Sequence, residues 1–462
     1  MGMKSIVDKI LGTQAKQIAF SFFIVIFVGS LLLSLPISQS TTSQAEYLDH
    51  LFTSVSLVCV TGLFTEPVYM TYTTFGQIIC MILMQIGGLS LMTLMSLSIY
   101  YLRNQVSLRN QYLVQSTINR TTNYDLKNFL KHMVLFTLTV EAVCSILVSI
   151  RLIPQYGVLK GIFSSIFLAI SAFNNAGFDN LSASSLLAYQ SDAIVLLPIA
   201  FSIIFAGLGF SVWYELRHMA KDYLKQEPKS LKLIYHRMSL HSRVVIIGTV
   251  SILIFGTLST WLIEMDNVHS IGQMPWDDQL LNSFFQTVSM RTAGFATLDY
   301  SQTKFATNML YILQMVIGGS PGGTAGGIKV TTLVIIFLYL RAEVRGATYI
   351  SVFKRSLSSS ILRRAVSVFF FYLTTLMIGW FLILLTNPSL DPFKVIFECV
   401  SALSTVGVSI NLTTSLNRIG QIILMALMFL GRVGPLTVFM SLSLRQHAHK
   451  DIRYAKTDLL IG

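Results

Sequence analysis

Charged residues are scarce in this chain of 462 residues. Asp, Glu, Lys and Arg together make up 12% of it, which is about half of the share that a soluble domain usually carries. Hydrophobic residues make up 53%, and the mean hydropathy is +0.65. This composition excludes a soluble enzyme or binding domain and predicts a chain that crosses a membrane several times.

Patterns for metal, disulfide and nucleotide chemistry are also missing. The cysteines at positions 59, 80, 144 and 399 show no CxxC or Cys/His spacing, so we expect buried thiols. No G-x-G-x-x-G occurs, and Ile328 separates Gly327 from Lys329, which breaks the P-loop pattern. The longest expected cytoplasmic segments, at about thirty residues, are too short for a dinucleotide-binding fold. We therefore predict neither an enzyme nor an ATP-driven pump, and no cofactor in this chain.

Basic residues, by contrast, are abundant and unevenly placed. The net charge is +12, and 25 of the 33 Lys and Arg residues fall in segments 1–16, 101–131, 215–243, 341–364 and 445–456. These segments alternate with connections poor in Lys and Arg, which is typical of loops kept on the cytoplasmic side. The surplus charge therefore indicates membrane topology rather than nucleic-acid binding, with both termini in the cytoplasm. The first apolar run lacks a small-residue cleavage site, so we expect it to be retained.

Apolar runs of two lengths alternate along the chain. Eight are long enough to span a bilayer and fall near residues 18–35, 75–100, 133–152, 193–214, 244–263, 307–340, 365–386 and 419–444. Four shorter pieces, 47–58, 159–173, 275–288 and 391–404, are too short to cross and predict re-entrant helices. The predicted fold is an all-α polytopic membrane protein with eight transmembrane helices and four re-entrant pore helices.

A glycine-containing string follows each short piece. The glycines Gly62, Gly177, Gly294 and Gly407 are separated by 115, 117 and 113 residues. Four unrelated surface turns would explain each string but not their even spacing. We therefore predict four parallel helix–pore-loop–helix repeats around one pore. Their boundaries are residues 1–16 for the N-terminus, 17–100, 101–216, 217–341 and 342–444 for the repeats, and 445–462 for the tail.

Such a ring suits the dehydration of a cation. Backbone carbonyls from four converging strings can replace the water shell of an ion, and glycine lets the backbone turn its carbonyl inward. The short helices can aim their partly negative C-terminal ends at the ion path. Thr61, Thr292 and Thr405 add hydroxyl groups to the strings.

Residues 317–329 interrupt the sixth long run with six glycines, one proline and one lysine. As one helix, residues 307–340 would reach about 51 Å, well beyond the roughly 30 Å hydrocarbon layer. Glycine and proline disfavour a helix interior, so we expect the helix to break. Irregular backbone at that depth is tolerated only beside protein or water, which predicts a loop next to a cavity.

The strings and this loop resemble the superfamily of K+ transporters that includes bacterial Trk and Ktr membrane subunits and plant and fungal HKT and Trk proteins. The resemblance covers nearly the whole chain. Its motifs are Thr61-Gly62, Ala172-Phe-Asn-Asn-Ala-Gly-Phe178, Thr287-Val-Ser-Met-Arg-Thr-Ala-Gly-Phe295, Ser404-Thr-Val-Gly407, the glycine-rich loop, and Gly431-Arg-Val-Gly-Pro435. Because the first repeat begins without two extra N-terminal helices, the chain resembles the Ktr-type pore subunits, KtrB or KtrD, more than TrkH.

The resemblance implies K+ uptake across the bacterial plasma membrane by a homodimer. The pore subunit would sit on a ring of cytoplasmic RCK-type nucleotide-binding subunits, KtrA or KtrC, often with dependence on Na+. It places K+ against the filter strings, which are Val60, Thr61, Gly62; Asn175, Ala176, Gly177; Thr292, Ala293, Gly294; and Thr405, Val406, Gly407. It places an intramembrane gate at Gly318, Gly319, Pro321, Gly322, Gly323, Gly326, Gly327, Lys329 and Arg432.

Two features bear on selectivity. Some Na+-preferring plant relatives carry serine at the first filter glycine, so Gly62 indicates K+ selectivity. Val60 and Asn175 depart from the threonine that the other two strings carry at the same place. This departure leaves open how strictly the innermost ion position selects K+.

Ionisable residues inside the apolar runs need partners. Our hypothesis is that Arg432 donates to carbonyls of the glycine-rich loop and holds it across the pore; a purely structural brace between repeats is the alternative. Lys329 could gate or could anchor the loop by reaching cytoplasmic water. For Glu398 we favour a hydrogen-bonded structural acid over an ion ligand.

A coupled carrier is the main functional alternative, because transporters also use broken helices at mid-depth. Their usual mark is an inverted repeat. The four repeats here are parallel, which favours a channel-like path.

Overall fold

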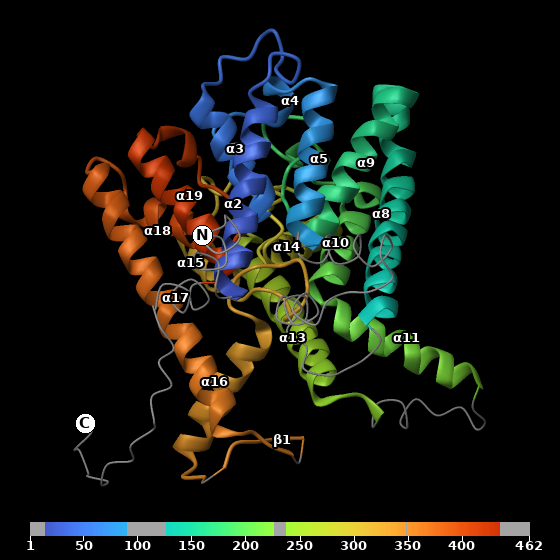
Figure 1. The fold of residues 1–462 in the computed structure, drawn as a ribbon, viewed down its shortest axis with the longest axis vertical. Coiled ribbons are helices and arrows are strands. Elements are labelled where there is room, and N and C mark those ends of the chain that lie inside the picture. Colours follow the sequence, from blue (N-terminus) through green and yellow to red (C-terminus); the bar gives the residue numbers. More distant parts are fainter. Residues whose placement is uncertain (1–13, 90–125, 226–236, 348, 354, 435–462) are drawn as a thin grey trace, which may run out of the picture.

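The computed structural model describes residues 14–89, 126–225, 237–347, 349–353 and 355–434, and it is mostly helical (Figure 1). Each predicted repeat begins with a long helix: α2 (Gln14–Leu33), α8 (Leu126–Tyr156), α13 (Leu240–Glu264) and α17 (Ser359–Thr386). Each of these helices is long and apolar enough to cross a membrane. They extend the predicted runs mainly at their N-terminal ends.

A shorter helix packs against each long one: α3 (Tyr47–Cys59), α9 (Val158–Asn174), α14 (Trp276–Ser289) and α18 (Pro392–Leu403). They contain 13, 17, 14 and 12 residues. At about 1.5 Å per residue none of them reaches across a 30 Å hydrocarbon layer. The glutamate and aspartate at 46 and 49 form a capping box at the start of α3, and Asp391 caps α18.

The closing helices of the repeats are less regular. They are α5 (Thr74–Leu89), α10 (Ala193–Gly207) followed by α11 (Phe210–Lys225), α15 (Phe305–Val316) followed by α16 (Val330–Val344), and α19 (Arg418–Val433). The predicted break in the sixth run is confirmed, because no helix covers residues 317–329. The ends of the predicted runs 75–100 and 419–444 lie outside the described residues.

The prediction of one continuous span over residues 193–214 is wrong. Helix α10 ends at Gly207, and α11 leaves it at an angle of 95°. Gly209 lies between them with φ +88°, a conformation that glycine adopts without steric cost. If this bent pair counts as one span, five spans in the described part of the chain meet the length and composition criteria.

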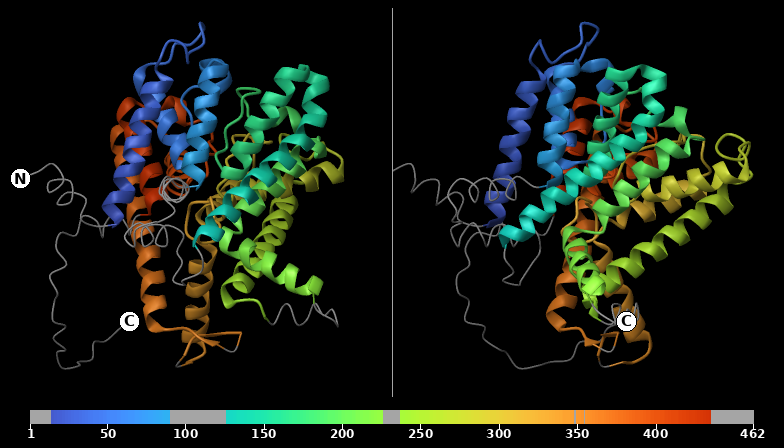
Figure 2. Two further views of the ribbon diagram at one scale, coloured as in Figure 1. Left: turned by 45° about the vertical axis from the view of Figure 1, so that its right-hand side comes forward. Right: turned by 90° about the vertical axis from the view of Figure 1, so that its right-hand side faces the viewer.

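A small hairpin departs from the all-α expectation. Strands β1 (Ser351–Val352) and β2 (Arg355–Ser356) pair antiparallel between α16 and α17. Figures 1 and 2 show α16 and α17 side by side, with the hairpin at the far end of the molecule from α4 (Val68–Thr71). Two 3-10 turns, η1 (Leu187–Tyr189) and η2 (Thr413–Ser415), complete the described elements.

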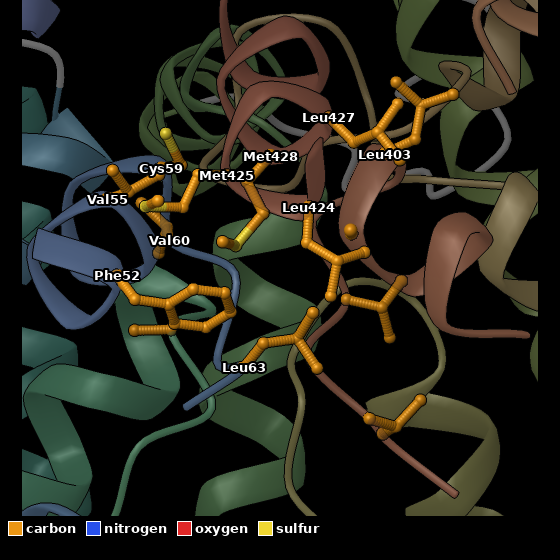
Figure 3. Close-up of a cluster of buried hydrophobic side chains, with 14 of the residues drawn as sticks. Phe52, Val55, Cys59, Val60, Leu63, Leu403, Leu424, Met425, Leu427 and Met428 are labelled. Carbon is orange, nitrogen blue, oxygen red and sulfur yellow. The ribbon is translucent and has the colours of Figure 1, made fainter. Parts of the chain in front are cut away.

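The largest apolar core joins the first repeat to the fourth. Helix α3 packs against α19, and Met425 and Met428 lie beside Cys59 and Val60 (Figure 3). All four cysteines are buried and free, as predicted. The two ends of the repeat series are therefore neighbours in space, which a ring requires.

Candidate functional site: the filter strings and the glycine-rich loop

The four filter strings share one backbone conformation. The first residue of each is left-handed, with φ of 57° at Val60, 58° at Asn175, 71° at Thr292 and 53° at Thr405. The glycine two residues later also has positive φ, at 106°, 71°, 83° and 93° in chain order. Left-handed valine and threonine are uncommon and persist only where surrounding structure holds them, typically at functional sites.

The strings meet as a closed ring. A methyl group added at Gly62 would lie 2.8 Å from the carbonyl oxygen of Ala176, and one at Gly177 would lie 2.8 Å from that of Ala293. A methyl group added at Gly294 would lie 2.6 Å from the carbonyl oxygen of Val406, and one added at Gly407 would lie 2.0 Å from that of Thr61. Each glycine therefore faces the carbonyl before the glycine of the next string, and the fourth string returns to the first.

Buried serines brace the strings from behind. The backbone N–H of Gly62 donates to Ser56 Oγ at 3.0 Å, and that of Gly407 to Ser401 Oγ at 3.0 Å. In the second repeat, Ser171 Oγ accepts from the N–H of Phe178 at 2.9 Å. The third repeat has Val288 at the matching position, and Ser289 Oγ donates instead to the carbonyl of Phe295 at 2.5 Å.

Several oxygen atoms of the strings are suited to a monovalent cation. Thr61 Oγ1, Thr405 Oγ1 and Asn175 Oδ1 are buried and, among the described residues, have no hydrogen-bond partner. Buried polar atoms are normally satisfied. Together with the carbonyls of the ring, they offer the neutral oxygen ligands that replace the water shell of K+ in selective pores.

Residues 317–329, the gate loop hereafter, are closed at the neck by backbone bonds. The N–H of Gly318 donates to Ile328 O at 2.9 Å, and the N–H of Ile328 donates to Val316 O at 3.1 Å. Gly318 and Gly327 lie so close that a methyl group on Gly327 would meet the Gly318 Cα at 3.2 Å. The loop is thus an ordered insertion between α15 and α16.

One edge of the gate loop touches the filter strings. The N–H of Gly326 donates to Thr292 Oγ1 at 3.3 Å, and a methyl group at Gly326 would lie 2.1 Å from Thr405 Oγ1. Thr324 Oγ1 donates to the carbonyl of Phe173, near the end of α9, at 3.2 Å. The loop therefore lies directly against the first residues of the third and fourth strings.

The opposite edge rests in the elbow between α10 and α11. The N–H of Ser320 donates to Gly207 O at 2.8 Å, and the N–H of Phe210 donates to Gly322 O at 3.1 Å. Gly209 lies close to Pro321, because a methyl group there would meet the Pro321 carbonyl at 3.0 Å. This elbow was not predicted, although Gly207-Leu-Gly209 in an apolar run is a readable signal for it.

The two cations of the predicted gate both bind backbone carbonyls. Arg432 Nη1 donates to Thr324 O of the gate loop, and Nη2 donates to Gly87 O at 2.6 Å and Gly88 O at 3.3 Å. Lys329 Nζ donates to Ala325 O at 2.6 Å and Gly326 O at 3.4 Å. The lysine thus folds back on the loop, and it remains partly exposed. Gly87 and Gly88 were not predicted as partners.

The buried acids lie behind the strings. Glu398 accepts from Ser409 Oγ, from Thr413 Oγ1 at 3.1 Å and from the Leu412 N–H at 3.3 Å. Through these bonds Glu398 braces the segment that follows the fourth string, which is the role of a structural acid. Glu141 accepts from Gln85 Nε2 and Asn174 Nδ2, each at 3.3 Å.

Comparison with known proteins identifies the family of the chain. The model of the TrkH family, described as cation transport protein, matches residues 8–451. The chain belongs to this family. It is 35% identical over 451 residues to "Ktr system potassium uptake protein B" of Bacillus subtilis (strain 168), covering 97% of each chain.

Two further relatives add to the comparison. "Potassium/sodium uptake protein NtpJ" of Enterococcus hirae is 33% identical and covers 100% of this chain and 99% of its own length. The crystal structure of the potassium transporter TrkH from Vibrio parahaemolyticus has a TM-score of 0.68 at 18% identity, covering 92% of this chain and 85% of that one. At that identity the structural match shows the fold alone.

Proposed function

We propose that this member of the TrkH family takes up K+ as the ion-translocating subunit of a Ktr-type system. The observation that carries the proposal is the closed ring of glycines and carbonyls made by four strings with the same backbone conformation. A ring of inward carbonyls replaces the hydration shell of a dehydrated cation. The names of the relatives in Bacillus subtilis and Enterococcus hirae support K+ as that cation.

In this function the gate loop is the barrier to K+ below the filter strings. Its hydrogen bond to Thr292 and its contacts with Thr405 bring it against the first residue of two strings. Arg432 holds the loop from α19 while also binding carbonyls of α5. Opening therefore requires the loop to leave contacts with three of the four repeats.

The remaining parts of the proposal concern topology and partners. Eight spans, with the bent pair α10 and α11 counted as one of them, and four re-entrant helices, in the repeat boundaries given above, would place both termini in the cytoplasm of a bacterial plasma membrane. A homodimer with a cytoplasmic RCK-type nucleotide-binding ring is expected from the Ktr relatives, because a Ktr system protein named B or D implies further components. No nucleic acid is involved.

Flux measurements test this function. K+ and Na+ flux into liposomes that contain the purified chain, alone and with a cytoplasmic subunit added, would be compared between the natural protein and Gly62→Ser. We expect K+ flux to exceed Na+ flux and the preference to fall in the variant, since the serine side chain would crowd the Ala176 carbonyl. Equal K+ and Na+ flux in the natural protein would overturn the proposal.

A Na+-coupled carrier is the second candidate. The name of the Enterococcus hirae relative includes both potassium and sodium, and that observation favours it. Coupling predicts that K+ entry requires Na+ and follows the Na+ gradient in a fixed ratio. A channel-like path predicts K+ entry in choline buffer without Na+.

A further inference from the structure

The residue before each left-handed string residue occupies an equivalent position in all four repeats. These residues are Cys59, Asn174, Arg291 and Ser404, each directly preceding the residue with positive φ. They precede the three residues of each filter string. They lie where the short helix ends and the string begins, so they control how the string leaves the helix.

In three repeats this position is bonded to the first helix of its own repeat. Ser404 Oγ and Tyr372 Oη of α17 lie 2.6 Å apart, with both residues buried. Asn174 Nδ2 donates to Glu141 Oε1 of α8 at 3.3 Å and to Gln85 Oε1 of α5 at 2.6 Å. Arg291 Nη2 donates to Thr249 Oγ1 of α13 at 3.4 Å. In the first repeat, Cys59 lies in the apolar core.

We infer that Asn174, Arg291 and Ser404 are positioning residues that pin the filter strings to the surrounding helices and so help set the preference for K+ over Na+. The inference rests on the filter proposed above. Its basis is the recurrence of a lateral polar bond at one register position, formed by three chemically different pairs.

The physical link is the conformation of the next residue. Left-handed Thr405 is strained, and a small rotation at its peptide would turn a string carbonyl away from the ion path. A bonded neighbour opposes that rotation, and selectivity depends on the size and ligand geometry of the carbonyl cage. The Tyr372–Ser404 pair is the clearest test, because it is the shorter of the two bonds that join only two side chains, at 2.6 Å against 3.4 Å for Arg291 and Thr249.

The test measures cation binding by thermal stabilisation of the purified full-length chain in choline buffer, with K+ or Na+ added. A cation that binds the folded state raises the melting temperature, and at a given concentration the cation that binds more tightly raises it more, whether the gate is open or closed. The readout is the ratio of the Na+ to the K+ concentration that gives the same rise in melting temperature. The melting temperature without either cation reports general stability separately.

We expect Tyr372→Phe and Ser404→Ala each to lower this ratio by about threefold, from the loss of one buried hydrogen bond. The double variant should fall no further than either single variant, because both remove the same bond. Tyr189→Phe is the control, since it removes a hydroxyl that donates to Gln155 Oε1 at 2.8 Å outside the filter. It should lower stability and leave the ratio unchanged.

Gly62→Ser distinguishes a failure of the filter assignment from a failure of the role given to the positioning residues. If it changes the ratio while Tyr372→Phe and Ser404→Ala do not, the pins have no role in selectivity and the inference is overturned. If Gly62→Ser also leaves the ratio unchanged, or if the natural protein does not prefer K+, the filter assignment itself fails and the inference falls with it.

Discussion

Arg432 Nη2 lies 2.6 Å from the carbonyl oxygen of Gly87. This bond ties α19 of the fourth repeat to α5 of the first, while Nη1 of the same side chain binds Thr324 of the gate loop. One guanidinium therefore joins the fourth repeat to the first, where the ring closes, and also binds the loop that we propose as the gate.

Replacing Arg432 should release the gate loop. Lysine keeps the charge but lacks the planar fork that binds several carbonyls at once. Losing charge-assisted bonds to the loop should raise the K+ flux of the resting protein by about tenfold or more in Arg432→Lys and Arg432→Ala. The measurement is K+ flux into liposomes without an added cytoplasmic subunit.

Arg418→Ala is the matched control for that experiment. Arg418 lies on the same helix, but its side chain pairs with Glu46 at 2.7 Å and Asp49 at 3.0 Å instead of binding the gate loop. Its loss should leave resting flux unchanged. If Arg432→Ala also left both flux and its regulation unchanged, Arg432 would be a structural brace only.

The four filter glycines should differ in their tolerance of a side chain. Gly407→Ala would place a methyl group 2.0 Å from the Thr61 carbonyl, whereas Gly62→Ala would place one 2.8 Å from the Ala176 carbonyl. We expect Gly407→Ala to abolish K+ flux and Gly62→Ala to reduce it.

Gly157→Ala controls for backbone strain in that series. Gly157 also has a positive φ, at 82°, but nothing lies within 4 Å of the added methyl group. It should keep most of the K+ flux despite a similar conformational cost. Equal losses in Gly157→Ala and Gly407→Ala would mean that strain, not closure of the ring, limits flux.

The elbow between α10 and α11 offers a test of how the gate loop is seated. Gly209→Ala combines a left-handed conformation with a 3.0 Å approach to the Pro321 carbonyl, so it should displace the loop and change resting K+ flux several-fold. Gly207→Ala, two residues away, meets nothing within 4 Å and has no positive φ. Only the first variant should change flux; a similar change in both would remove the loop contact as the cause.

Glu398→Gln distinguishes a structural acid from an ion ligand. Its carboxylate accepts bonds from Ser409, Thr413 and the Leu412 N–H, and the amide of glutamine would turn N–H groups towards some of these donors. A mismatch of this kind costs about 1–3 kcal/mol. We expect a lower melting temperature with an unchanged K+ to Na+ flux ratio. A lost K+ preference at unchanged stability would make Glu398 a ligand.

Much of this arrangement could be predicted because it repeats. The glycines at 62, 177, 294 and 407 mark the strings by spacing alone, and the bounds of α3, α9, α14 and α18 agree with the short apolar pieces to within about two residues. The break at residues 317–329 followed from glycine and proline propensities. The strings were found from a repeat along the whole chain, whereas the short helices and the break are local signals, each read from a short stretch of sequence.

What escaped prediction depends on contacts between distant residues. The backbone groups at the 95° turn after Gly207 find their partners in the gate loop, whereas apolar composition alone favoured a straight helix. Gly87 accepts from Arg432 across 345 positions of sequence, which hydropathy does not reveal. The serines at 56, 171 and 401 could have been predicted from the sequence, because each lies six residues before a filter glycine.

The contact between Gly407 and Thr61 also has a consequence for biosynthesis. The carbonyl that completes the ring is that of Thr61 in the first repeat, and the glycine that faces it is Gly407 in the last repeat. During translation, the first three repeats can enter the membrane with the ring still open on one side. In the filter that we propose, a nascent chain therefore cannot conduct ions selectively until its fourth repeat has been inserted, so the ion path would form only near the end of synthesis.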